Sequence, residues 1–257
     1  MYRSSVSIQV ALVVPCFNEA DRFDCEYWSQ VGSIECVELL FVDDGSSDAT
    51  TQVLAEFTAG NDRFRMLPLN QNVGKAEAVR LGLRQILSDG SAQLVGFADA
   101  DTSIPAVEFE RLLDLAQEKI LNGNAESLWA SRVALAGRGI KRSFFRHAVG
   151  RTIANLVAIG EPPLPYDTQC GFKVFDPAES FISACSNGFT TRWFVDLEIF
   201  FRLRERMGRP PIIWEEPVQG WSESSGSHLG LRSFPQVARD LIVLKLGSVK
   251  HRSRPSA

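Results

Sequence analysis

The sequence lacks an excess of positive charge, a cysteine framework and any apolar run of membrane-spanning length. Its 257 residues carry 27 Lys and Arg against 31 Asp and Glu, a net charge of −4. Because phosphate neutralisation needs a basic excess, this balance argues against a nucleic-acid partner. The hydrophobic share of 45% is enough for a packed core and excludes disorder as the main state.

The five cysteines show neither the paired spacing of a zinc site nor a regular disulfide framework, so we expect a reducing, cytosolic setting. The N-terminus lacks a charged region followed by a long apolar run, and we expect no signal peptide. The longest apolar runs, around residues 8–17 and 241–246, are far shorter than the roughly 20 residues that span a bilayer. These absences predict a cytoplasmic protein that contacts the inner face of a membrane at most peripherally.

Short apolar runs alternate with amphipathic helical stripes along the chain. The runs predict strands at 8–14, 38–42, 93–98, 128–131, 171–175 and 212–216. The stripes predict helices at 48–57, 75–87, 105–119, 193–207 and 235–246. This alternation predicts an α/β fold, a doubly wound and mostly parallel sheet flanked by helices, in a single large domain whose second half is less regular.

Polar clusters follow three of the predicted strands: Pro15 to Glu19, Asp43 to Ser46, and Asp99 to Thr102. Ligands of doubly wound sheets bind beyond the carboxyl ends of the strands, so the three clusters are expected to share one crevice. Asp99 and Asp101 suit Mg²⁺ or Mn²⁺, and a carboxylate at 43 or 44 suits the N–H groups of a base. For Asp99 and Asp101 the alternative is a surface loop. For the carboxylate at 43 or 44 it is a turn with a helix cap at Ser46, Ser47 or Asp48.

Pro-x-x-Asn-Glu at 15–19, Val-Asp-Asp-Gly-Ser at 42–46 and Asp-x-Asp at 99–101 together resemble the family 2 nucleotide-sugar glycosyltransferases of the GT-A fold. Segments 72–80, 167–175, 192–198 and 221–229 are most similar to the polyprenyl-phosphate (dolichyl-phosphate) β-glucosyltransferases. The resemblance spans about residues 8–246. It implies a nucleotide-sugar-binding half at about 6–132, an acceptor half at about 133–246 and a basic tail at 247–257.

The resemblance also implies roles for particular residues. Those that hold the nucleoside are Pro15, Phe17, Glu19, Val42 and Asp44. Asp99 and Ala100 line the ribose and pyrophosphate, Asp101 ligates the metal with Asp99 beside it, and Lys75 and Arg132 lie near the donor. His228 stands where the family usually has Lys, and three roles stay open for it: metal ligand, pH-dependent cation on the pyrophosphate, or solvated loop residue.

The implied reaction is an inverting, metal-dependent transfer of a hexose, glucose from UDP-glucose, to a polyprenyl phosphate. That acceptor is an anion at neutral pH and needs little help from a base, whereas a hydroxyl acceptor would need one. The candidate bases are Asp167, Asp196 and Glu198. Asp196 and Glu198 do not share a helix face, so only one is expected in the cleft; the structural alternative pairs Asp196 with Arg192. Two other functions stay open: the same donor with a soluble hydroxyl or carboxylic-acid acceptor, and nucleotide-sugar binding without turnover.

Residues 127–160 contain no Asp or Glu and six positive side chains: Arg132, Arg138, Lys141, Arg142, Arg146 and Arg151. Apolar residues recur there at helical spacing, at Phe145, Val149, Ile153 and Leu156. The pattern predicts a helix on an anionic membrane surface, and the alternative is a core helix with solvated arginines.

Overall fold

The computed structural model describes residues 9–141, 152, 164–222, 236 and 239–244. Apart from residue 152, the predicted helix around 145–156 lies outside these residues. The same holds for Arg142, Arg146, Arg151, His228 and the basic tail. The strands are β1 Val10–Cys16, β2 Val37–Asp43, β3 Phe64–Pro68, β4 Leu94–Ala98, β5 Ser127–Ser131, β6 Gly139–Lys141, β7 Phe172–Phe175, β8 Ile213–Pro217 and β9 Gly220–Ser222. The helices are α1 Cys25–Gly32, α2 Thr50–Thr58, α3 Lys75–Asp89, α4 Ala106–Leu121, α6 Glu179–Cys185 and α7 Val195–Met207.

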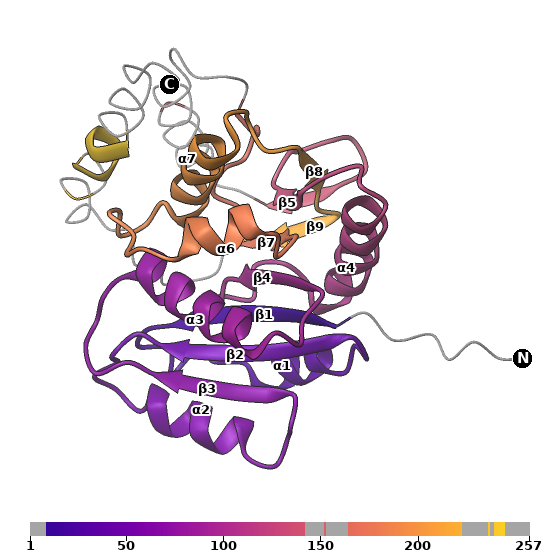
Figure 1. The fold of residues 1–257 in the computed structure, drawn as a ribbon. Coiled ribbons are helices and arrows are strands. Elements are labelled where there is room, and N and C mark those ends of the chain that lie inside the picture. Colours follow the sequence, from indigo (N-terminus) through magenta and orange to yellow (C-terminus); the bar gives the residue numbers. More distant parts are fainter. Residues whose placement is uncertain (1–8, 142–151, 153–163, 223–235, 237–238, 245–257) are drawn as a thin grey trace, which may run out of the picture.

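A seven-stranded sheet in the order β3-β2-β1-β4-β7-β5-β8 runs through the molecule (Figure 1). Strand β7 is antiparallel to β4 and β5, and the other pairings in this sheet are parallel. The strand order reverses between β1 and β4, and such a switch point opens a crevice at the carboxyl ends of the two strands. Strands β6 and β9 form a separate parallel pair. The fold is therefore the expected mostly parallel α/β sheet, with one antiparallel strand in its middle.

Side chains alternate between the two faces of the sheet and build a core on each. One face packs against α1, α2 and α4, where Trp28 meets Phe41 edge to face with ring centroids 5.5 Å apart. The other face packs against α3, α6 and α7. Full burial of one such large apolar side chain contributes about 2–3 kcal/mol, so both layers fix the sheet and the strand ends that it presents.

Most predicted elements are confirmed to within a few residues. The six predicted strands are β1, β2, β4, β5, β7 and β8, and four predicted helices are α2, α3, α4 and α7. Val79, Leu83 and Ile86, predicted as one helical stripe, are all buried. Of the predicted helix 235–246, the described residues 236 and 239–244 are helical.

The sequence pattern missed α1, β3, α6, β6 and β9, which are all short. In β3 only Phe64 is buried, so no apolar run marks it. All five cysteines fall within the described residues and none forms a disulfide. Within the described ranges, no helix has both the length and the apolar character needed to cross a bilayer.

Candidate functional site

The loops after β1 and β4 each contain a non-glycine residue in the left-handed region, Asn18 with φ 52° and Thr102 with φ 54°. Asn18 is tied to the loop after β2: its N–H donates to Ser46 Oγ at 2.9 Å and its Oδ1 accepts from Ser47 N at 2.9 Å. In that loop Asp48 accepts from Thr50 N, the first N–H of α2, at 3.0 Å. Asn tolerates the left-handed conformation better than most residues, and strained backbone of this kind is frequent at functional sites.

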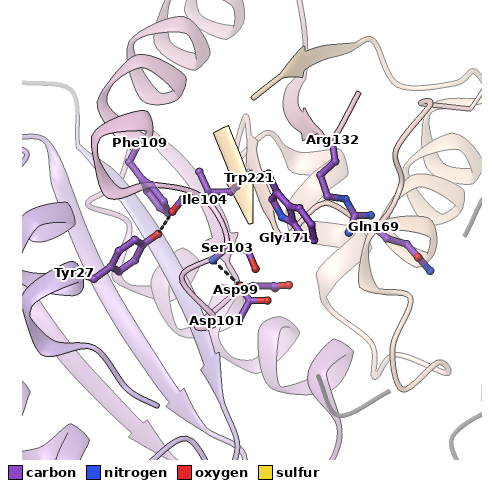
Figure 2. A pocket seen from close by; sticks show the side chains of 10 residues that line it. All are labelled: Tyr27, Asp99, Asp101, Ser103, Ile104, Phe109, Arg132, Gln169, Gly171 and Trp221. Carbon is purple, nitrogen blue, oxygen red and sulfur yellow. Dashed lines mark hydrogen bonds between the residues drawn. The ribbon is translucent and has the colours of Figure 1, made fainter. Parts of the chain in front are cut away.

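A pocket opens beside the end of β4 (Figure 2). It is lined by Tyr27, Asp99, Asp101, Ser103, Ile104, Phe109, Arg132, Gln169, Gly171 and Trp221. Figure 2 shows Asp99 and Asp101 side by side at the pocket, with Tyr27 on one side and Arg132 and Gln169 on the other. Three predicted site residues, Asp99, Asp101 and Arg132, therefore meet in one pocket.

The two carboxylates have different partners. Asp99 forms an ion pair with Lys75 at the start of α3, with Nζ 2.6 Å from Oδ1. Asp101 accepts from Ser103 N at 3.1 Å, and burial together with the charge of Asp99 raises its pKa. Within the described residues no cluster of three or more His, Cys, Asp or Glu side chains is placed to hold a metal. Asp99 and Asp101 can thus supply two oxygen ligands, and a bound cation would need others from substrate or solvent.

Arg132, which follows β5, is held rigidly at the pocket. Its Nε and Nη2 donate to the two carboxylate oxygens of Asp167 at 2.6 and 2.7 Å. Burial opposes ionisation of Asp167, but the hydrogen bonds and charge of Arg132 hold its pKa well below the usual range. Glu215 accepts the N–H of Asp167 at 2.7 Å, and the Trp221 ring lies 5.5 Å from the guanidinium. Asp167 therefore supports the orientation of Arg132 at the pocket.

The predicted nucleoside residues lie at the ends of β1 and β2. Asp44 accepts from Val73 N at 2.7 Å and Gly74 N at 2.9 Å, and so holds the loop that leads into Lys75. Burial raises the pKa of Asp44 against the effect of these bonds. Asp43 accepts from Ser46 N at 3.0 Å, so both carboxylates of this strand end have intramolecular partners.

Of the remaining nucleoside residues, Pro15 and Phe17 are half-buried and Glu19 is buried. The Val42 side chain is fully buried in the core beneath α3, which leaves only its backbone to border a ligand. Ala100 is also buried, between the two pocket carboxylates.

The other two candidate bases are buried in α7. Asp196 pairs with Lys173 at 2.7 Å. Glu198 accepts from the backbone of Thr190 and Thr191 at 2.7 and 2.9 Å and from Arg202 at 2.8 Å. All three predicted bases are therefore engaged by cations.

Several pocket residues were absent from the sequence-based set. Gln169, Gly171 and Trp221 lie in motifs that carried the resemblance, so a signal for them was present. The sequence contained no signal for Tyr27, Ser103 and Phe109. They reach the pocket only through the packing of α1, α4 and the loop before α4.

The sequence model described as "Glycosyl transferase family 2" matches residues 11–124. Curated proteins named "Dolichyl-phosphate beta-glucosyltransferase" match nearly the whole chain. The Drosophila melanogaster protein is 31% identical, over 93% of this chain and 75% of its own length. The Homo sapiens protein is 30% identical with the same coverage, and that of Saccharomyces cerevisiae is 29% identical over 95% of this chain and 76% of its own.

Solved structures share the fold at lower identity. Glucosyl-3-phosphoglycerate synthase from Mycobacterium tuberculosis, in complex with Mn²⁺, UDP and phosphoglyceric acid, has a TM-score of 0.67 at 17% identity. The match covers 97% of this chain and 80% of that one. S. aureus TarS 1–349 matches with a TM-score of 0.56 at 18% identity, over 93% of this chain and 66% of that one.

Proposed function

The chain belongs to glycosyl transferase family 2 and is a hexosyltransferase of the GT-A fold, and on this premise we propose that it transfers glucose from UDP-glucose to a polyprenyl phosphate with inversion. The observation that carries the proposal is the pocket in which Asp99 and Asp101 face Arg132. Carboxylates for a cation and a fixed arginine are what a nucleoside diphosphate requires of its binding site.

The carboxylate pair fits Mg²⁺ or Mn²⁺. Burial and the neighbouring charge of Asp99 raise the pKa of Asp101, and a divalent cation would relieve that repulsion. Hard cations are usually held by one or two carboxylates and substrate phosphates, which is the donor set that this pocket offers. The cation supplies charge for the departing diphosphate when it is bound.

Arg132 supplies positive charge from the protein at the same pocket. Two of its nitrogens are fixed by Asp167, so the guanidinium keeps one orientation at the pocket without reorganising. Preorganised positive charge of this kind stabilises the negative charge that builds on a leaving diphosphate. In this proposal the nucleoside is held by Pro15, Phe17, Glu19, Val42 and Asp44. Asp99 and Ala100 line the ribose and pyrophosphate, and Lys75 lies near the donor. His228 lies outside the described residues.

The state of the candidate bases favours a phosphate acceptor. Asp167, Asp196 and Glu198 are each held by a cation, so none of the three is placed as a ready proton acceptor. A phosphate monoester is already an anion at neutral pH and needs no such base. The curated relatives are named for dolichyl phosphate, a lipid of the same chemical class.

A second candidate keeps the donor and changes the acceptor to a soluble hydroxyl compound or carboxylic acid. It is favoured by the structural neighbour solved with phosphoglyceric acid. Product analysis with short polyprenyl phosphates and with phosphoglyceric acid distinguishes the two. The donor is tested by thermal-shift measurements with Mn²⁺ and UDP-glucose, UDP-galactose, UDP-GlcNAc or GDP-mannose, and preferential stabilisation by GDP-mannose would overturn the donor assignment.

Replacing Asp101 tests the metal role. We expect Asp101→Asn to lower transfer by at least about 10²-fold, because a neutral amide is a weaker ligand for a hard cation. The measurement is the rate of hexose transfer as a function of Mn²⁺ concentration, with unfolding temperature recorded alongside. Asp62→Asn, a change of the same kind at an exposed position, serves as the control. Wild-type turnover in Asp101→Asn would refute the assigned role.

A further inference from the structure

Lys173 in β7 is a lysine with no exposed surface at all. Its Nζ lies 2.7 Å from Asp196 Oδ2 and donates to the carbonyl of Cys170. The rings of Trp129 and Phe97 lie 4.9 and 5.6 Å from the same nitrogen. An ammonium group buried among aromatic rings is costly unless a carboxylate compensates it, so Asp196 is the partner that makes this arrangement stable.

The carbonyl that Lys173 binds belongs to Cys170, the residue before the pocket residue Gly171. Cys170 is followed by Gly171, whose carbonyl accepts the N–H of Asp99 at 2.7 Å. A Cβ atom on Gly171 would lie 2.3 Å from Asp99 Cγ, so the turn touches the Asp99 side chain as well. The position of the Cys170–Gly171 turn therefore fixes where the Asp99 carboxylate can point.

Asp99 is held from its other side by Lys75 at 2.6 Å. Burial alone would lower the pKa of Lys75, but Asp99 and, more weakly, Asp196 and Asp101 raise it. Asp99, Lys75, Asp196 and Lys173 are thus buried or half-buried charges of alternating sign. They connect the pocket carboxylate to the first turn of α7 in the acceptor half.

We propose that Lys173 and Asp196 form a positioning pair that anchors the Cys170–Gly171 turn and thereby orients Asp99 for a divalent cation and a nucleoside diphosphate. The inference rests on the proposed function, since it assigns the pair to the donor site. It gives Asp196 a positioning role in place of that of a base. Neither residue lines the pocket, so their effect is expected in the affinity for the donor and in the KM for the donor.

The test separates this role from simple support of the fold. Lys173→Met and Asp196→Asn are each expected to lower the unfolding temperature, because each leaves an uncompensated buried partner. The double variant Lys173→Met/Asp196→Asn removes both and is expected to recover most of that loss. Its affinity for UDP with Mn²⁺, measured by calorimetry, is expected to remain at least about 10-fold below wild type because the turn has lost its anchor.

Asp196→Glu provides a second variant that keeps both charges and shifts the carboxylate by one methylene. We expect it to fold and to weaken UDP binding several-fold, with the KM for the acceptor unchanged. Arg80→Met is the matched control: Arg80 is buried and paired with Glu77, and it does not line the pocket. It is expected to lower stability and leave the affinity for UDP unchanged.

Wild-type affinity for UDP with Mn²⁺ in the folded double variant or in Asp196→Glu would overturn the positioning role and leave the proposed function standing. A wild-type protein that binds neither UDP nor GDP in the presence of Mn²⁺ would overturn the proposed function and the inference with it.

Discussion

At the scale of single residues, Glu19 is a buried carboxyl that neighbouring carboxylates repel. Its carboxyl is buried at the end of β1, and burial raises its pKa to about 7 from an ordinary value of 4.5. Arg22, at 2.8 Å, opposes this effect, while Asp101, Asp48 and Asp99 add to it. The charged form of Glu19 is therefore less favourable in the folded protein than in the unfolded chain.

This shift predicts a pH dependence of stability. The folded protein holds the Glu19 proton more tightly than the unfolded chain, so its contribution is complete below pH 4.5 and is lost as the pH rises through 7. At pH 8 the free energy of unfolding of Glu19→Gln is expected to exceed that of wild type by on the order of 1–3 kcal/mol, and its unfolding temperature to be higher. At pH 5 little difference is expected. Thermal unfolding without divalent metal measures this, and equal stability of the two proteins at pH 8 would contradict the assigned shift.

The orientation of Arg132 depends on partners that lie far from it in the sequence. The sequence places it after a strand, and the structure adds Asp167, 35 positions away, and the ring of Trp221. The Asp167 carboxylate thus fixes an arginine that follows β5. In the proposed function this pairing makes Asp167 a support for Arg132.

At the scale of elements, β7 is the strand that connects β4 to β5 in the sheet. It runs antiparallel between β4 and β5, and its N-terminal turn continues the pairing with β4 through Asp99. Gly171 in that turn has no room for a side chain, since Asp99 occupies the space. The strand thereby brings the Cys170–Gly171 turn against Asp99.

Gly171→Ala is therefore expected to displace the Asp99 side chain. We expect the affinity for UDP with Mn²⁺ to fall by at least about 10-fold, because a Cβ 2.3 Å from Asp99 Cγ forces a shift. Gly188→Ala is the control, since the nearest atom to its Cβ would be a Glu77 oxygen at 3.8 Å. Equal affinities of the two variants in calorimetry would show that the turn does not set the orientation of Asp99.

At the scale of the whole molecule, charge is unevenly distributed. The stretch 127–160 carries six positive side chains and no acid, and removing these six from the net charge of −4 leaves −10 for the rest. Two of the acids, Asp99 and Asp101, line the pocket. We propose that the basic stretch, most of which lies outside the described residues, attracts an anionic lipid surface and the phosphate of the acceptor.

A flotation assay with vesicles containing anionic lipid tests this attraction. The protein is expected to float with the vesicles at low salt and to remain in solution at 1 M salt, where the screening length is about 3 Å. The variant Arg142→Gln/Arg146→Gln/Arg151→Gln is expected to float less, and zwitterionic vesicles serve as the control. Wild-type protein that stays in solution with anionic vesicles at low salt would refute the proposal.

The sequence by itself determined six of the seven strands of the main sheet and the carboxylates Asp99 and Asp101 at a strand end, because periodicity and motif spacing are local properties of the chain. Only the tertiary structure decided which cation meets which carboxylate. Lys173 with Asp196 and Arg132 with Asp167 are pairs between residues far apart in the chain, brought together by the packing of β5, β7 and α7. Burial makes such pairings obligatory, since a charge removed from water needs a partner. The spacing of residues along the sequence does not show which partner the packing will place there.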